Sequence, residues 1–169
     1  MGEVTGLTGH IPEYVHPVDV LQGVCDAEGF SYERDDADCL DMEWVGVWTT
    51  YHLSFSWIES LESLHMGCAF ELKVPKNRLA EVRELVRLIN EQSWVGHFDL
   101  WDNDNTVLYR YSLILPGGVE LSPAQCNFMV QSGVGAADQY YQAFHYVVWA
   151  GKSAKEALEA VQFVTVGEA

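Results

Sequence analysis

Basic residues are scarce in this sequence. Nine lysines and arginines stand against 25 aspartates and glutamates, which gives a formal net charge of −16 over 169 residues. Such a charge repels phosphate backbones and anionic membrane surfaces, so we expect neither nucleic acid nor a membrane as a direct partner. The same charge either keeps a small protein soluble or attracts a basic protein partner, and composition leaves both interpretations open.

Long apolar runs and paired cysteines are also missing. No stretch approaches the roughly 18 apolar residues of a membrane helix, and residues 1–16 lack the basic and apolar regions of a signal peptide. The cysteines form no C-x-x-C pair and have no histidine at zinc-finger spacing. They are Cys25, Cys39, Cys68 and Cys126. We therefore expect a cytoplasmic protein with free thiols and without a metal or other cofactor.

Motifs of known enzymes are incomplete wherever the sequence suggests one. Residues 151–153 end like a P-loop, but Tyr146 stands where that motif needs its first glycine. The aspartate-rich turns 35–38 and 102–105 do not complete a calcium-binding loop, and no G-x-S-x-G elbow is present. The sequence therefore predicts a protein that is not an enzyme and that acts by binding.

His97 and Asp99 are the strongest candidates for a chemical site. They lie two residues apart in a predicted strand and share one face, where they could hold a metal or act as acid and base. A third ligand at a convincing spacing is lacking, so a hydrogen-bonding role at a strand end is favoured. His52 and His65 could form a second pair across a predicted hairpin. A small metal- or ligand-binding sensor, or a hydrolase that uses His97 and Asp99, is the alternative function.

Regular changes of hydrophobic period define the predicted fold. Alternation with period two predicts an antiparallel meander over residues 30–72 and a second hairpin around the turn at 102–105. Helical spacing predicts helices that begin near residues 17, 75, 122 and 153. The helix from residue 75 should cover the sheet face that contains Tyr51. Gly133 and Gly135 predict a bend in the long helix after residue 122.

One face of the predicted meander carries small polar side chains. His52, Ser54 and Ser56 alternate with large apolar residues, so they point away from the core. Either solvent or another chain could cover this face. We expect His52, Ser54, Ser56, Trp48 and Trp101 to contact another polypeptide, since tryptophan is enriched at interfaces. Strand addition or a hydrophobic groove would be the mechanism.

An ordered set of short motifs runs through the chain. It comprises YHLSFSW at 51–57, CAFE at 68–71, VP at 74–75, NE at 90–91, W-x-GHFDLW at 94–101, F-x-x-x-VW-x-GKS at 144–153, and Pro17. Over roughly residues 16 to 168, this set resembles the YbjN family of bacterial proteins, which are described as sensory transduction regulators. The resemblance implies a fold like that of type III secretion chaperones, commonly dimeric, and it offers no catalytic residues.

These observations combine into one prediction. Residues 1–15 form a flexible arm, and residues 16–169 form a single YbjN-like α+β domain. Its twisted antiparallel sheet has about five strands, with helices packed on one face. The protein acts as a homodimeric, non-enzymatic binding module, either a regulator of sensory transduction or a chaperone-like adaptor. Its partner is another polypeptide, and a basic polypeptide is one of the two alternatives that the net charge leaves open.

Overall fold

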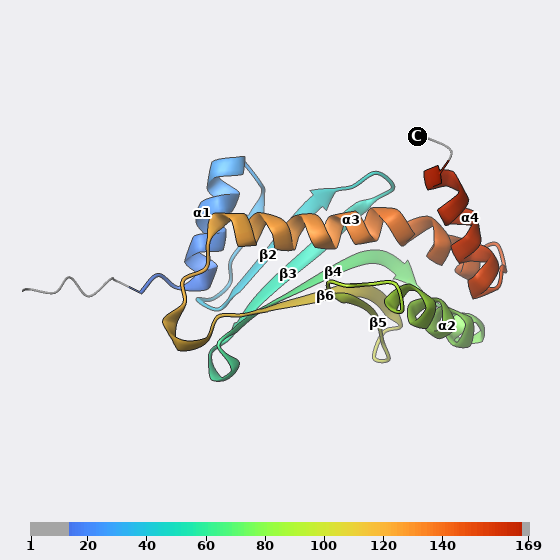
Figure 1. The fold of residues 1–169 in the computed structure, drawn as a ribbon, viewed down its shortest axis with the longest axis horizontal. Helices are drawn as coiled ribbons and strands as arrows, with labels where there is room; N and C mark the ends of the chain where they lie inside the picture. The colour runs from blue at the N-terminus through green and yellow to red at the C-terminus, as the bar shows by residue number, and fades with distance from the viewer. Residues whose placement is uncertain (1–13, 167–169) are drawn as a thin grey trace, which may run out of the picture.

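The computed structural model describes residues 14–166, so the predicted arm at residues 1–15 lies almost wholly outside the described residues. The described chain forms one six-stranded antiparallel sheet and four α-helices (Figure 1). In chain order the elements are α1 Pro17–Glu28, β1 Tyr32–Glu33, β2 Cys39–Val45, β3 Thr50–Ile58, β4 Ser63–Lys73, α2 Leu79–Asn90, β5 His97–Trp101, β6 Thr106–Ile114, α3 Pro123–Val148 and α4 Ala154–Val166.

The strands lie in the order β1-β2-β3-β4-β6-β5, and each strand is antiparallel to its neighbours. This confirms the predicted α+β class and both hairpins. The sheet has six strands where about five were predicted, and the first of them, in the predicted meander, is short: Tyr32 and Glu33 pair with Met42 and Asp41. Between β4 and β6 the register shifts after Ala69, so β4 bulges there and bends locally.

Helix α3 covers the apolar face of the sheet, as Figure 1 shows. The fully buried Tyr51 ring packs edge-on to Tyr141 of α3, and its hydroxyl donates to Asp138 at 2.6 Å. The expectation that α2 covers the Tyr51 face is therefore wrong. Only a short connection separates α2 from the end of β4, so α2 stays at that end and packs mainly on α4 and β5.

Two glycines in α3 have different environments, and neither interrupts the helix. The 26 residues of α3 run as one helix, so the predicted bend is wrong. A Cβ atom on Gly133 would lie 3.0 Å from the Met66 sulfur and 3.2 Å from the Cys68 Cβ, whereas one on Gly135 would meet nothing within 4 Å. Gly133 therefore allows α3 to approach β4 closely.

The C-terminal helix begins at Ala154, next to its predicted start near residue 153. The Ser153 amide donates to the Glu156 carboxylate at 2.9 Å, and the Glu156 amide donates to the Ser153 hydroxyl, which together form a capping box. Helix α4 then continues to Val166. In the part of the chain that the structure describes, no helix is both long and apolar enough to cross a membrane.

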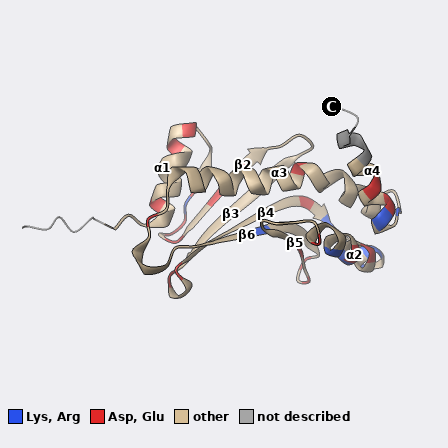
Figure 2. Ribbon diagram, viewed as in Figure 1, with Lys and Arg blue, Asp and Glu red and all other residues tan. Residues whose placement is uncertain are grey.

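Charge is unevenly distributed along the molecule. Figure 2 shows lysine and arginine gathered on α2 and at the start of α4, whereas α1 at the opposite end carries acidic residues. On α2, Arg83 pairs with Asp102 at 2.8 Å, and Arg87 pairs with Glu84 and Glu91. Most of the visible positive charge is therefore already neutralised by neighbouring carboxylates.

Candidate binding site on the open face of the sheet

The sheet has an open face, which is the one opposite α3. Alternation along the strands places large apolar side chains under α3 and smaller ones on the open face. In the three central strands these are His52, Ser54 and Ser56 of β3; His65, Gly67 and Ala69 of β4; and Leu108, Arg110 and Ser112 of β6.

A trough of about 330 Å³ runs over these strands. Its lining extends along β6 from Thr106 to Ser112, which at about 3.4 Å per residue corresponds to roughly 20 Å. Gly67 and Ala69 lie on β4, between the β3 and β6 walls. Their small size creates the depression, because larger side chains stand on both flanking strands.

The trough brings together four of the five residues that the sequence analysis selected for partner contact. His52, Ser54, Ser56 and Trp101 all line it. Trp48 does not: its indole nitrogen donates to the Asp138 carbonyl at 3.0 Å, which holds it against α3 on the other side of the sheet. A contact of Trp48 with a partner stays a prediction, but it would belong to a different surface.

The two histidines of the open face are not neighbours. His52 lies opposite Ala69 and His65 lies opposite Ser56, so the predicted cross-strand histidine pair is wrong by four residues of register. The His52 ring nitrogens lie 3.5 Å from Glu43 and 3.7 Å from Glu71, one carboxylate on each neighbouring strand.

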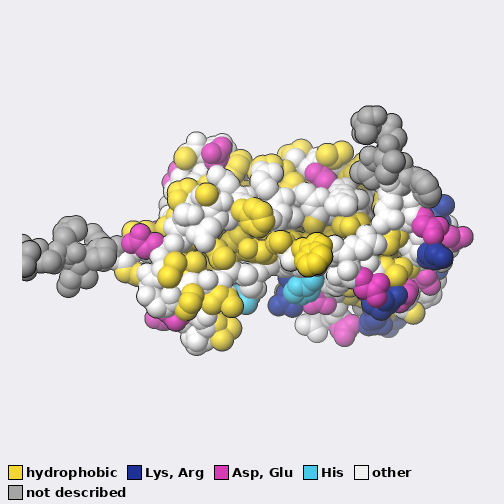
Figure 3. Space-filling model, viewed as in Figure 1, with side chains coloured by type: hydrophobic (Ala, Val, Ile, Leu, Met, Phe, Trp, Pro, Cys, Tyr) yellow, Lys and Arg dark blue, Asp and Glu magenta, His cyan; other side chains and the backbone are white. Residues whose placement is uncertain are grey.

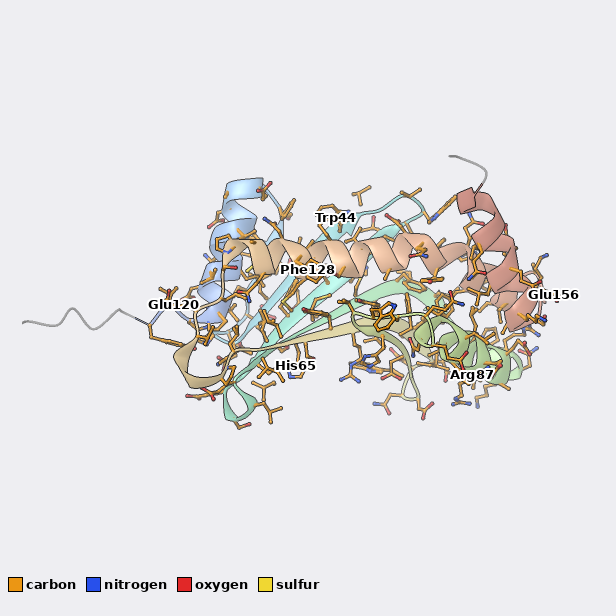
Figure 4. All side chains as sticks on the ribbon, in the orientation of Figure 1. Trp44, His65, Arg87, Glu120, Phe128 and Glu156 are labelled. Carbon is orange, nitrogen blue, oxygen red and sulfur yellow. The ribbon has the colours of Figure 1, made fainter. Side chains whose placement is uncertain are left out.

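His65 has one satisfied and one unsatisfied ring nitrogen. Its Nδ1 lies 2.8 Å from the Ser112 hydroxyl oxygen. Its Nε2 is buried and has no hydrogen-bond partner among the described residues. Figure 4 shows His65 on the side of β6 opposite Phe128 of α3. Because a buried polar atom is normally hydrogen-bonded, Nε2 is an exception within this side of the sheet.

His97 and Asp99 do not form an acid–base pair. Arg110 of β6 donates to the Asp99 carboxylate at 3.1 Å, so the carboxylate is held by a cation on the neighbouring strand. His97 is exposed and lies directly opposite Arg110 in the β5–β6 register. Among the described residues, no three histidine, cysteine, aspartate or glutamate side chains are placed to hold a metal ion.

Nucleophilic sulfur is also poorly supported. The cysteines are free, and Cys25, Cys68 and Cys126 are buried. Burial raises the pKa of Cys25 to about 11 and the pKa values of Cys68 and Cys126 to about 12. Since the thiolate is the reactive form, these three thiols are inert at neutral pH.

Sequence reasoning found the β3 wall of the trough and missed the β6 wall. Leu108, Arg110 and Ser112 were missed because alternation shows which residues share a face but not which strands are neighbours. The small residues Gly67 and Ala69 were an available signal, since two of them at a spacing of two in a strand leave room on that face.

The fold is that of an α+β domain in which helices cover one face of an open antiparallel sheet. A family model described as "YbjN: Putative bacterial sensory transduction regulator" matches residues 17–145, so the chain belongs to the YbjN family. This is not a known enzyme family.

A solved structure shares the fold. The crystal structure of YbjN from E. coli, titled "a putative transcription regulator", superposes with a TM-score of 0.52 and 17% sequence identity. The match covers 88% of this chain and 94% of the E. coli chain. No curated protein matches the sequence.

Proposed function

We propose that this chain is a non-enzymatic regulatory module whose trough binds an extended segment of another polypeptide. The shape of the trough carries the proposal. The lining follows β6 for roughly 20 Å and includes residues of β3 and β4 along the same direction. A hollow of this length suits a linear occupant.

The trough also offers the polar groups that an extended chain needs. Ser54 and Ser56 present hydroxyl groups from β3, and Ser112 presents one from β6. The amides and carbonyls of a bound segment would hydrogen-bond to these groups. Trp101 at the other end is 50% exposed and provides a large apolar surface of the kind that anchors interfaces.

Charge near the trough favours a basic occupant. Glu43 and Glu71 flank His52, and Asp104 lines the trough beyond Trp101. The arginine of the trough, Arg110, is already paired with Asp99. A lysine or arginine in the bound segment would therefore meet carboxylates, and the net charge of −16 would attract such a partner at long range.

Peptide binding measured on two glycine variants tests the proposal. Random twelve-residue peptides displayed on phage are selected on the protein, and their affinities are measured by calorimetry. Gly67→Val should weaken binding at least about tenfold because the new side chain fills the trough. Its Cβ would lie 3.5 Å from Leu108, an ordinary contact, so the fold should persist.

Gly135→Val is the matched control, since it adds the same side chain where nothing lies within 4 Å. It should leave the affinity unchanged. The trough would be refuted as the binding site if both variants bound with equal affinity and if the backbone amide signals that shift in NMR spectra on peptide binding lay outside β3, β4 and β6. The homodimer implied by the family resemblance stays a prediction, which sedimentation equilibrium tests.

A further inference from the structure

Strand β6 has an edge that no other described strand covers. Strand β5 pairs with β6 only from Thr106 to Arg110, which leaves Tyr111–Ile114 without a neighbour on that side. Gly96, next to His97, explains why the pairing stops. Its φ is +63°, and a Cβ there would lie 2.2 Å from the Tyr109 hydroxyl oxygen, so only glycine can turn the chain away at this point.

The register identifies which backbone groups of this edge are free. The Leu115 amide donates to the Glu62 carbonyl at 2.7 Å, so the backbone N–H of Leu115 is directed to the β4 side. In an antiparallel ladder the backbone N–H and C=O groups of successive residues face alternate sides of the strand. Those of Leu113 and Tyr111 therefore also face β4. The backbone N–H and C=O groups of Ser112 and Ile114 face the opposite side, where they can hydrogen-bond to a further strand.

The two sides of this edge differ in chemistry. On the helix side a hollow of about 200 Å³ is lined by Tyr111, Leu113, Ala124, Gln125 and Phe128. The Phe128 ring lies edge-on to Tyr111 at 6.2 Å and is 52% exposed, whereas Ile114 lies on the opposite side, with Ser112, and is 66% exposed. Figure 3 shows hydrophobic side chains gathered in the furrow beneath α3. On the other side, Ser112 and His65 belong to the trough.

Carboxylates flank the Ile114 end of the edge. Glu62 accepts from the Gly117 amide at 3.0 Å, just beyond β6, and Glu59 lies in the same turn as Glu62. Glu120 follows in the segment that leads to α3, and Figure 4 places it at this end of the molecule. None of these three carboxylates pairs with a cation in the described part of the chain.

We propose that the partner segment adds to the β6 edge as an additional strand, with alternate side chains on its two sides. This inference rests on the proposed function in that the partner is an extended polypeptide, and it places that polypeptide along the β6 edge, beside the trough. Apolar side chains enter the hollow beside Phe128, and polar ones face Ser112 and His65. Lysines or arginines beyond Ile114 meet the carboxylates of Glu59, Glu62 and Glu120. A second copy of the chain suits this edge less well, because it brings its own charge of −16.

A designed peptide tests the arrangement directly. The probe is a fluorescently labelled octapeptide that alternates valine with threonine and ends in three lysines. We expect saturable binding by fluorescence anisotropy, together with slower exchange of the Ser112 and Ile114 amide protons. Methylating the backbone nitrogens that face β6 should weaken binding at least about tenfold, whereas methylating the alternate nitrogens should have little effect.

Two variants of the chain provide the matching test from the protein side. Ile114→Pro removes a donor that β4 does not use, so the sheet should form while peptide affinity falls about tenfold. Ile114→Thr retains the donor and should bind as the unaltered chain does. The methylated peptides keep the test decisive even if the proline variant fails to fold.

Each other outcome overturns the edge arrangement in a recognisable way. Peptide binding that shifts Ser54 and Gly67 amides, without protecting Ser112 and Ile114, would retain the trough and reject the edge. Protection of the edge amides that depends on protein concentration, without peptide binding, would assign the edge to a second copy. Absence of any peptide binding or edge protection would reject the edge, while the phage-selected peptides still test the trough separately.

Discussion

A pair of alanine substitutions two residues apart in α3 measures how tightly this helix is pressed on the sheet. Replacing a helical glycine with alanine stabilises a helix by about 0.5–1 kcal/mol through backbone entropy. Gly135→Ala should show this gain alone, since its new methyl group meets nothing within 4 Å. The midpoint of thermal unfolding should rise by roughly 2–4 °C per kcal/mol for a chain of this size.

Gly133→Ala carries the same helical gain and an added packing cost. Its methyl carbon would lie 3.0 Å from the Met66 sulfur and 3.2 Å from the Cys68 Cβ. The flexible Met66 side chain can move, but the Cys68 Cβ is attached to the β4 backbone, so α3 must shift. Overpacking of this kind costs about 1–3 kcal/mol, which gives a net change between about zero and 2.5 kcal/mol of destabilisation.

Urea unfolding followed by circular dichroism measures both changes in the free energy of unfolding. The difference between the two variants isolates the packing cost, provided that the dependence on urea concentration is the same for both. If Gly133→Ala stabilises the protein as much as Gly135→Ala does, then α3 does not press on β4 at this point. The account given above for Gly133 would then be wrong.

Three further predictions follow from buried polar groups and thiols. Asp138→Ala should lower the free energy of unfolding by about 1–3 kcal/mol because the buried Tyr51 hydroxyl loses its acceptor, and adding Tyr51→Phe to this variant should restore part of the loss. Ellman's reagent should modify Cys39 rapidly in the native protein and the three buried cysteines only on unfolding; rapid modification of all four would contradict the described burial. Burial raises the pKa of Tyr109 to about 12 from 10.0, so stability held below pH 10 should be lost between pH 10 and 12, with a shallower loss in Tyr109→Phe.

Much of the fold could be predicted from the sequence because one face of the sheet is buried. Large apolar residues such as Leu53 and Phe55 alternate with Ser54 and Ser56, and this alternation marks both strand type and face. The meander was predicted to begin at residue 30, but its first strand is confined to Tyr32–Glu33, and so short a strand has bounds that a period of two does not define. The position of α2 depends on where the preceding strand ends in space, which local spacing does not specify.

The candidate site was predictable only along single strands. The polar face of β3 was found because His52, Ser54 and Ser56 lie in one continuous pattern. The pairing of His52 with His65 failed because register depends on the length of the turn that joins β3 and β4. Trp48 was grouped with the open face because composition identifies an exposed tryptophan without showing which side it occupies, and Asp138 of a distant helix decides that.

The position of α3 in the chain has a consequence for synthesis. The apolar faces of β3 and β4 are complete at Lys73, but the helix that covers them ends 75 residues later at Val148. At about 5–20 residues per second, a growing chain exposes this surface for roughly 4–15 s before its cover is finished. We expect ribosome-bound chains that stop after Lys73 to bind general chaperones, and chains extended beyond Val148 to be released from them.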